Sequence, residues 1–268
     1  MKAFTFDVNQ CNGCYCCQIG CKDEHCGNDW TPYAKPQPLT GHFWGKLNDY
    51  VRGNVPHVKM SFIFVPCQHC EDATCIDACP YEAIYRRSDG LVIIDPVKCI
   101  GCRECLHPDA CPYGVIYWNA NSHIAQKCTG CAHLIDRGEI FAPRCADNCP
   151  VLALKFGEES ELDLSGTETL HPEYGLTTRV HYMNLPKRFI AGTVYDSGDK
   201  EIIEGATCTV TGSSGTSTAT TDHFGDFWLD GLASDDFTLE ISASGFSTKT
   251  MSVSTMDADV GLGNIDLA

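Results

Sequence analysis

The chain has 268 residues, 19 of them cysteines, and a formal net charge of −16. Its length allows two domains, and its acidic balance argues against nucleic acid or an anionic membrane as a partner. The acidity is uneven, since 13 of the 35 acidic residues but only 3 of the 19 basic ones lie in residues 188–268. No apolar run approaches the roughly 18 residues that a membrane-spanning helix needs, so we expect no direct membrane span.

The N-terminal segment leads almost directly into a cysteine motif. Residues 3–8 alternate as a short strand, and the run CNGCYCCQIGC follows. Its quartet is Cys11, Cys14, Cys17 and Cys21. Because so little chain precedes the motif, we expect no cleaved signal peptide. Thiolate clusters also need a reducing place of assembly, so we expect a cytoplasmic protein, with export alongside a signal-bearing partner as the alternative.

Residues 22–55 are rich in Pro, Gly and aromatic side chains, and they lack the period of a helix or a strand. Loops of this length are usually functional or disordered, and aromatic residues are enriched at interfaces. We therefore expect an excursion over the surface that binds a partner. An ordinary long loop is the alternative.

Two further quartets lie close together in the runs CQHCEDATCIDACP and CIGCRECLHPDACP. They are Cys67, Cys70, Cys75 and Cys79, and then Cys99, Cys102, Cys105 and Cys111. Three closely spaced thiolates and a fourth followed by Pro form the ligand run of the bacterial two-cluster ferredoxin, in which the fourth Cys crosses over to the neighbouring cluster. Residues 81–95 between the quartets fit this unit, because they read as two short strands turned at residues 88–90.

A fourth quartet follows a second predicted hairpin. Residues 114–119 and 124–127 read as the strands of that hairpin, and QKCTGC and RCADNCP come next. This quartet is Cys128, Cys131, Cys145 and Cys149, with an insertion between its second and third members. Residues 132–140 in the insertion read as a short helix, and residues 151–156 as a strand. The recurrence of one cysteine pattern indicates an internal repeat.

The crossover rule distributes sixteen cysteines over four [4Fe-4S] clusters. The inner quartets exchange their last members, and nested pairing lets the outer quartets do the same. The expected ligand sets are Cys67, Cys70, Cys75 and Cys111; Cys99, Cys102, Cys105 and Cys79; Cys11, Cys14, Cys17 and Cys149; and Cys128, Cys131, Cys145 and Cys21. The remaining Cys16, Cys26 and Cys208 are expected to be bystanders, the last as a small buried hydrophobe in a strand.

Other uses of these residues are disfavoured. Disulfide scaffolds suit short secreted chains, and structural zinc has no use for a closely following third Cys or a Cys-Pro ending. His69 and His133 lie inside ligand loops, but ligation by His would leave a surplus of cysteines, so we expect them to pack beside the clusters. Lys127 and Arg144 each precede a ligand cysteine and are candidates to raise a reduction potential, with an ordinary surface charge as the alternative. No nucleophile triad or carboxylate pair is recognisable, so we expect no catalytic site in this chain.

The composition changes at Arg188 towards Gly, Ser, Thr and Asp in short alternating runs. Runs and turns at this spacing predict about six or seven strands in an antiparallel β-sandwich. The expected organisation is a cluster-binding domain at residues 1–156, a linker or partner-binding arm at 157–187, and the sandwich at 188–268.

These motifs support a resemblance to known families. The first 187 residues resemble the four-cluster iron-sulfur subunits that accompany molybdopterin oxidoreductases of the dimethyl sulfoxide reductase family, through the four cysteine runs. The tail resembles prealbumin-like or carboxypeptidase-regulatory sandwiches, through GTVYD, EGATCTV, TDHFGDFWLDGL and SASGF. The combination is similar to small subunits of the pyrogallol-phloroglucinol transhydroxylase and resorcinol hydroxylase type, and CPYGVIYWN and RVHYMNL strengthen that match.

The resemblance implies an α+β fold of tandem two-cluster ferredoxin-like pseudo-repeats followed by a sandwich. It also implies an electron-transfer subunit docked on a large catalytic subunit that carries a molybdenum or tungsten bis-pterin cofactor. That complex would hydroxylate, dehydroxylate or transhydroxylate hydroxylated aromatics in an anaerobe.

The third quartet bears on the direction of electron flow. In the transhydroxylase branch, cysteines of this quartet can be missing, whereas Cys99, Cys102, Cys105 and Cys111 are all present here. The complete quartet favours exchange of electrons with an external electron donor or acceptor. Two alternatives are a linking subunit of a respiratory molybdopterin reductase with another substrate, and a cluster-based redox sensor or scaffold. Four clusters favour an electron-transfer chain, because a redox sensor needs only one cluster.

Overall fold

The computed structural model describes residues 1–139 and 141–268, which form two compact units. The first unit comprises Met1–Asp49 and Ser61–Leu185, and the second comprises Tyr50–Met60 and Pro186–Ala268. No helix among the described residues is long and apolar enough to cross a membrane.

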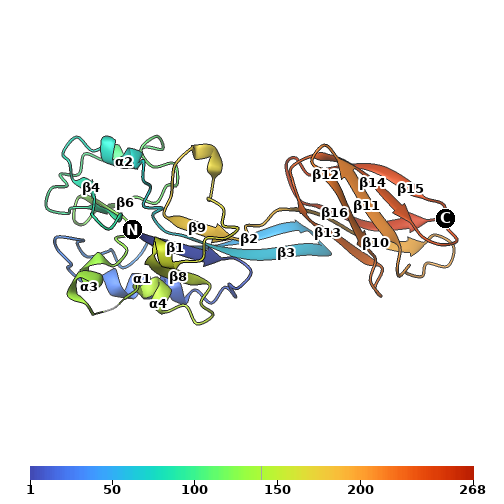
Figure 1. Cartoon of the computed structure of the whole chain (residues 1–268), viewed down its shortest axis with the longest axis horizontal. Coiled ribbons are helices and arrows are strands. Elements are labelled where there is room, and N and C mark those ends of the chain that lie inside the picture. Colours follow the sequence, from blue (N-terminus) through green and yellow to red (C-terminus); the bar gives the residue numbers. More distant parts are fainter. Residues whose placement is uncertain (140) are drawn as a thin grey trace. The chain divides into compact units, whose positions relative to one another are not determined.

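A three-stranded sheet joins distant parts of the first unit (Figure 1). Its central strand, β1 (Lys2–Asp7), pairs antiparallel with β8 (Leu154–Glu158) and parallel with β9 (Val180–Met183). The four residues in the middle of β1 are all buried, as expected for a strand with neighbours on both edges and cover on both faces. The sheet therefore brings the start of the chain against the segments that precede and follow residues 159–179.

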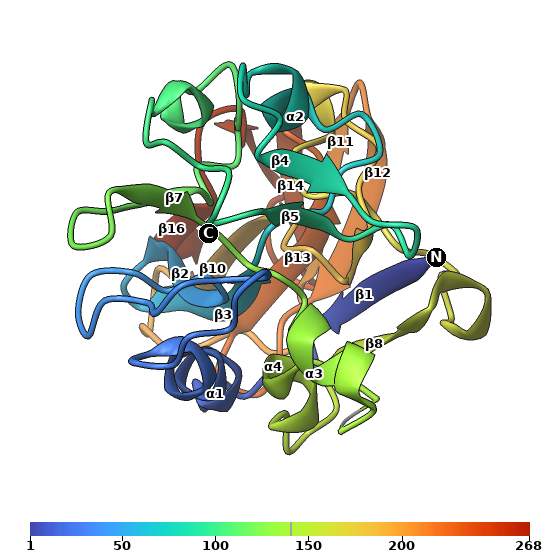
Figure 2. The same ribbon diagram turned by 90° about the vertical axis from the view of Figure 1, so that its left-hand side faces the viewer.

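Short hairpins and helices fill the rest of the first unit. The hairpins are β4 (Ile84–Arg86) with β5 (Val92–Ile94), and β6 (Tyr117–Asn119) with β7 (Ile124–Gln126), which confirms both predicted hairpins. The helices are α1 (Cys16–His25), α2 (Thr74–Asp77), α3 (Ala132–Arg137), α4 (Arg144–Asp147) and the 3-10 turns η1 (Glu104–Leu106), η2 (Glu159–Glu161) and η3 (Pro172–Tyr174). Figure 2 shows α1 and α4 side by side. Helix α3 ends at Gly138, which caps it at a φ of 69°; the predicted end at residue 140 lies outside the described residues.

A long hairpin occupies the end of the segment predicted to be a surface loop. Strand β2 (Lys46–Asn54) pairs with β3 (His57–Val65), and Trp44 immediately before it is fully buried. The prediction that residues 22–55 lack strand structure is therefore wrong at β2, although all its residues except Leu47 are exposed or partly exposed, and partner binding by this segment stays a prediction. Its strand is hard to recognise because KLNDYVRGN is polar or charged at most positions, so the alternation of strand residues is not visible.

The second unit is a sandwich of two sheets, with strand orders β13-β10-β16 and β12-β11-β14-β15. The strands are β10 (Arg188–Asp196), β11 (Thr207–Gly212), β12 (Gly215–Thr220), β13 (Asp226–Leu232), β14 (Asp236–Ser242), β15 (Lys249–Ser254) and β16 (Val260–Leu267). Alternate side chains of both sheets, such as Ile190, Cys208, Phe227 and Leu239, form the core between them. The seven strands match the predicted number.

One pairing in the sandwich differs from the prediction. Strand β10 runs parallel to β16, whereas the sandwich was predicted to be purely antiparallel. Strand β16 follows β15, which belongs to the other sheet. No tight hairpin therefore joins β16 to β10, and only a tight hairpin would force the antiparallel direction.

Residues 157–185 belong to the first unit and are not a separate linker. They include the end of β8 and all of β9, and the buried Tyr182 hydroxyl donates a hydrogen bond to the Phe64 carbonyl at 2.9 Å. Backbone pairing to β1 holds this segment in the sheet, which the sequence pattern could not reveal. Its role as a partner-binding arm stays a prediction.

Candidate metal centres

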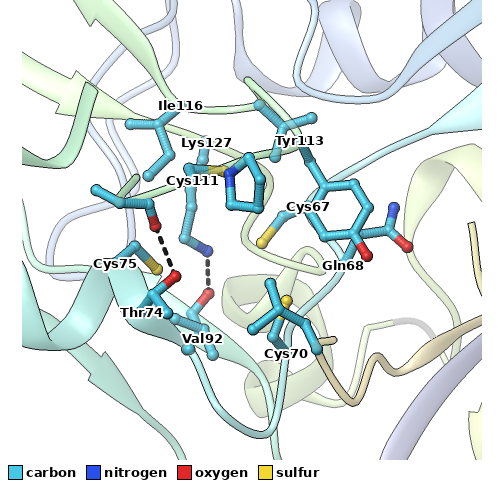
Figure 3. Close-up of a pocket in the computed structure, with 15 residues that line it drawn as sticks. Cys67, Gln68, Cys70, Thr74, Cys75, Val92, Cys111, Tyr113, Ile116 and Lys127 are labelled. Atoms are coloured by element: carbon cyan, nitrogen blue, oxygen red, sulfur yellow. Dashed lines mark hydrogen bonds between the residues drawn. The ribbon is translucent and has the colours of Figure 1, made fainter. Parts of the chain in front are cut away.

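The first group of thiols surrounds a pocket of about 350 Å³ (Figure 3). Cys67, Cys70 and Cys75 line this pocket together with Cys111, which comes from the following quartet. Burial, together with negative charge on the other three thiols, raises the pKa of Cys70 to about 12. Cys111, whose crossover was predicted from the spacing, therefore lies in one pocket with Cys67, Cys70 and Cys75, and the shared cluster stays a prediction.

The reciprocal exchange forms the second group. Cys79 leaves its own quartet and lines a pocket of about 330 Å³ with Cys99, Cys102 and Cys105. Burial, together with charge on Cys99, Cys79 and Cys102, raises the pKa of Cys105 to about 12. One hydrophobic core contains the buried Cys75 and Cys105, so the first two groups are neighbours.

The outer quartets meet where α1 packs against α4. Cys17 lies on α1 in a hydrophobic core against which Cys11 and Cys149 pack. Burial, together with charge on Cys11, Cys149 and Cys14, raises the pKa of Cys17 to about 12. Cys149 has therefore joined the three cysteines at the start of the chain, in a third group.

The fourth group lies deeper. Burial raises the pKa of Cys145 well above its usual value, and Cys21, Cys131 and Cys128 raise it further. All four thiols are buried. Every one of the four predicted sets is thus brought together, and their ligation of iron stays a prediction.

The CxxC loop that opens each quartet turns at its third residue. Gly13, Gly101 and Gly130 hold that position in three loops with positive φ, and His69 holds it in the fourth with a φ of 46°. Glycine adopts this conformation at little cost, whereas a bulky residue needs support from its surroundings. His69 has such support, because it is fully buried and its Nδ1 accepts a hydrogen bond from the Val92 N–H at 3.0 Å.

The donor set fits iron-sulfur clusters. Backbone N–H groups of His69 and Gly130 point at Cys67 Sγ and Cys128 Sγ, each at 3.4 Å, and hydrogen bonds to sulfur are among the features that set cluster potentials. The raised pKa values mean that a metal must displace the thiol protons as it binds. The cysteines of the first and second groups line pockets, an arrangement that suits a cluster of several iron atoms.

Charged side chains flank the fourth group. Glu24 Oε1 lies 3.1 Å from His133 Nε2, and Glu24 Oε2 accepts a hydrogen bond from Arg144 Nε at 2.8 Å. The sequence analysis did not identify Glu24 as part of a site. Its spacing of three residues from Cys21 on α1 was the available signal, since residues at that spacing share one face of a helix.

Lys127 is 2% exposed, so the surface-charge alternative is wrong for this residue. Its Nζ donates hydrogen bonds to the Val92 carbonyl and, at 3.2 Å, to the Cys128 carbonyl. Burial acts to lower the pKa of Lys127, but the thiols of Cys67, Cys75 and Cys128 outweigh it and keep the pKa above the usual value. The ammonium group therefore stays charged.

The three remaining cysteines differ from one another. Cys208 is fully buried in the sandwich core, as predicted. Cys26 is partly exposed near the end of α1. Cys16 is partly exposed at the start of α1, the neighbouring Cys14 raises its pKa, and its role as a bystander stays a prediction.

Two families match parts of the chain, and several known proteins match more of it. Residues 58–159 match the 4Fe-4S dicluster domain, and residues 190–268 match the carboxypeptidase regulatory-like domain. The chain is 38% identical over 271 residues to the pyrogallol hydroxytransferase small subunit of Pelobacter acidigallici, with 96% of each chain covered. It is 37% identical over 162 residues to one chain of the anaerobic dimethyl sulfoxide reductase of Escherichia coli, covering 59% of this chain and 74% of that relative. It is 32% identical over 216 residues to a putative dimethyl sulfoxide reductase iron-sulfur subunit of Halobacterium salinarum, covering 67% and 78%.

Proposed function

This protein belongs to the family of iron-sulfur electron-transfer subunits of molybdopterin oxidoreductases that includes the pyrogallol hydroxytransferase small subunit, and on that premise we propose its specific role. It holds four [4Fe-4S] clusters and carries electrons to or from a large molybdopterin subunit that acts on hydroxylated aromatics. The sixteen grouped cysteines are the ligands. The reacting groups for the aromatic substrate lie in the partner.

The continuous series of thiol groups is the observation that carries this proposal. Cys17 of the third group shares a hydrophobic core with Cys145 of the fourth, and Cys21 and Cys128 of the fourth group share another core with Cys67 of the first. The first and second groups share a core. The groups therefore form one line, in the order third, fourth, first and second.

The two ends of this line are the accessible ones. The exposed cysteines of the sixteen are Cys14 in the third group and Cys102 in the second. When bound, an iron-sulfur cluster supplies reversible electron transfer at a potential that its surroundings set. The protein contributes buried thiolates that exclude water in the middle of the line, and it leaves an opening at each end for exchange with the catalytic subunit and with an external donor or acceptor.

The aromatic substrate class rests on how much of the chain each relative matches. The pyrogallol hydroxytransferase small subunit covers 96% of this chain, whereas the two dimethyl sulfoxide reductase relatives cover 59% and 67%. Similarity that extends through the C-terminal sandwich favours the aromatic-acting branch. The second candidate, a linking subunit of a respiratory reductase, is supported by the relatives that share the cluster-binding residues alone.

Anaerobic co-production with the large subunit tests the proposal. The complex should contain about sixteen iron and sixteen acid-labile sulfide atoms in this chain, since each [4Fe-4S] cluster has four of each, and a hydroxylated aromatic should change the redox state of the clusters. The chain alone should have no hydroxylation activity. Stoichiometric zinc would contradict the cluster assignment, and clusters that respond to an oxyanion but not to any hydroxylated aromatic would favour the respiratory alternative.

A further inference from the structure

Lys98 and Lys127 occupy equivalent places in two ligand runs but have different environments. Each immediately precedes the first cysteine of a CxGC loop, Cys99 or Cys128. Lys98 is exposed, whereas Lys127 is 2% exposed. The local sequence gives the two lysines the same context, so any difference in their roles arises from the fold.

The Lys127 ammonium lies in the pocket of the first group rather than beside the thiol that follows it in sequence. Its side chain lines the pocket formed by Cys67, Cys70, Cys75 and Cys111, and Figure 3 shows it extending between Cys75 and Cys67. The hydrogen-bond partners of its Nζ are the backbone carbonyls of Val92 and Cys128, which are neutral. No Asp or Glu of the described residues forms an ion pair with it.

Arg144, the other cation predicted to tune a cluster, is neutralised locally. Its Nε lies 2.8 Å from Glu24 Oε2, and its Nη1 lies 3.8 Å from Asp147 Oδ2. A buried charge needs an opposite charge beside it. Arg144 has carboxylates, whereas Lys127 has only cluster ligands.

We infer that Lys127 is the counter-charge of the cluster held by Cys67, Cys70, Cys75 and Cys111, and that it raises the reduction potential of this cluster; the inference rests on the proposed function. Four thiolates make the site negative, and reduction adds one more electron to it. A fixed cation favours that electron strongly, because charges interact over a low dielectric in a buried pocket. The electron arrives from one neighbouring cluster and leaves to the other, so no further reactant is needed. The first group therefore holds an electron more readily than it would without Lys127.

Redox titration of the full chain in its complex, followed by electron paramagnetic resonance, tests the inference. Lys127→Met removes the charge and keeps a side chain of similar length. The equilibrium constant for one-electron reduction of one cluster should fall at least tenfold, which is a shift of about 59 mV to lower potential. Lys98→Met is the matched control and should leave every potential in place. Lys127→Arg keeps the charge and should stay close to the wild-type potential.

The cluster that responds must be the predicted one. Cys70→Ala removes a ligand from the first group alone, so the signal altered by Cys70→Ala must be the signal that Lys127→Met shifts. A shift in another signal, or full iron content with unshifted potentials, would overturn the inference.

Loss of iron from Lys127→Met would also be informative. If Lys127→Arg then restores both iron and the wild-type potential, the positive charge is what the site needs, which supports the inference. If Lys127→Arg also loses iron, Lys127 has a packing role and the inference fails. A low iron content in the wild-type chain would instead count against the proposed function. The reduction potentials of the Lys127 variants could still be compared with that of the wild type on the clusters that are present.

Discussion

Replacing Arg52 with Met should lower the unfolding temperature of the sandwich unit, because it leaves a buried carboxylate without its counter-charge. Arg52 Nη1 lies 3.2 Å from both oxygens of Asp259, whose side chain is 2% exposed. Removing one partner of a buried ion pair typically costs about 3–5 kcal/mol, and we expect the lower end because the Arg52 side chain is 20% exposed. At about 4–8 °C per kcal/mol for a unit of this size, the transition should fall by at least about 12 °C.

Differential scanning calorimetry of the full chain measures this transition, with Lys59→Met as the control. Lys59 pairs with Asp230 at 2.5 Å, but both side chains are substantially exposed, so its loss should cost less than about 1 kcal/mol. Combining Arg52→Met with Asp259→Asn removes both charges and should recover part of the lost stability. Equal effects of Arg52→Met and Lys59→Met, or no recovery in the double variant, would refute the reasoning.

Two further predictions concern other parts of the molecule. Gly101→Ala should remove the cluster of the second group and lower iron by about a quarter, because a Cβ there would lie 2.4 Å from the His123 carbonyl oxygen; Gly114→Ala, also at positive φ but with open space around it, should retain full iron content. An equal loss from both variants would mean that backbone conformation, and not the close contact, is responsible. Burial raises the pKa of Cys208 from 9.0 to about 12, so between these pH values the unfolded chain loses a proton that the folded chain keeps, and the stability of the sandwich falls as pH rises. Cys208→Ala should flatten this alkaline decline in unfolding temperature, and an unchanged profile would contradict the assignment.

The cysteine groups could be anticipated because ligand spacing is a local property of the sequence. Cys79 and Cys111 each end a run in Cys-Pro, and the crossover rule for such runs gives the groups that the fold assembles. The hairpin at residues 84–94 was likewise predictable, since a turn at residues 88–90 separates two apolar runs.

Other features depend on contacts between distant residues and left little trace in the sequence. Strand β9 is defined by its pairing with β1, more than 170 residues earlier. Strand β2 lacks a visible alternation because it is mostly polar. The burial of Lys127, in contrast with Lys98, follows from which pocket each loop faces, and a repeated Lys-Cys pair cannot reveal that.

The measurement that tests the central claim most directly is the iron content of two double variants in the anaerobic complex. The crossover places Cys79 with Cys99, so Cys79→Ala with Cys99→Ala should damage one cluster and leave the other three intact. Cys79→Ala with Cys67→Ala should damage two, because these residues belong to different groups. Paramagnetic resonance counts the intact clusters in each variant. One damaged cluster in the Cys79–Cys67 variant and two in the Cys79–Cys99 variant would show ligation in sequence order and would contradict the proposed four-cluster arrangement.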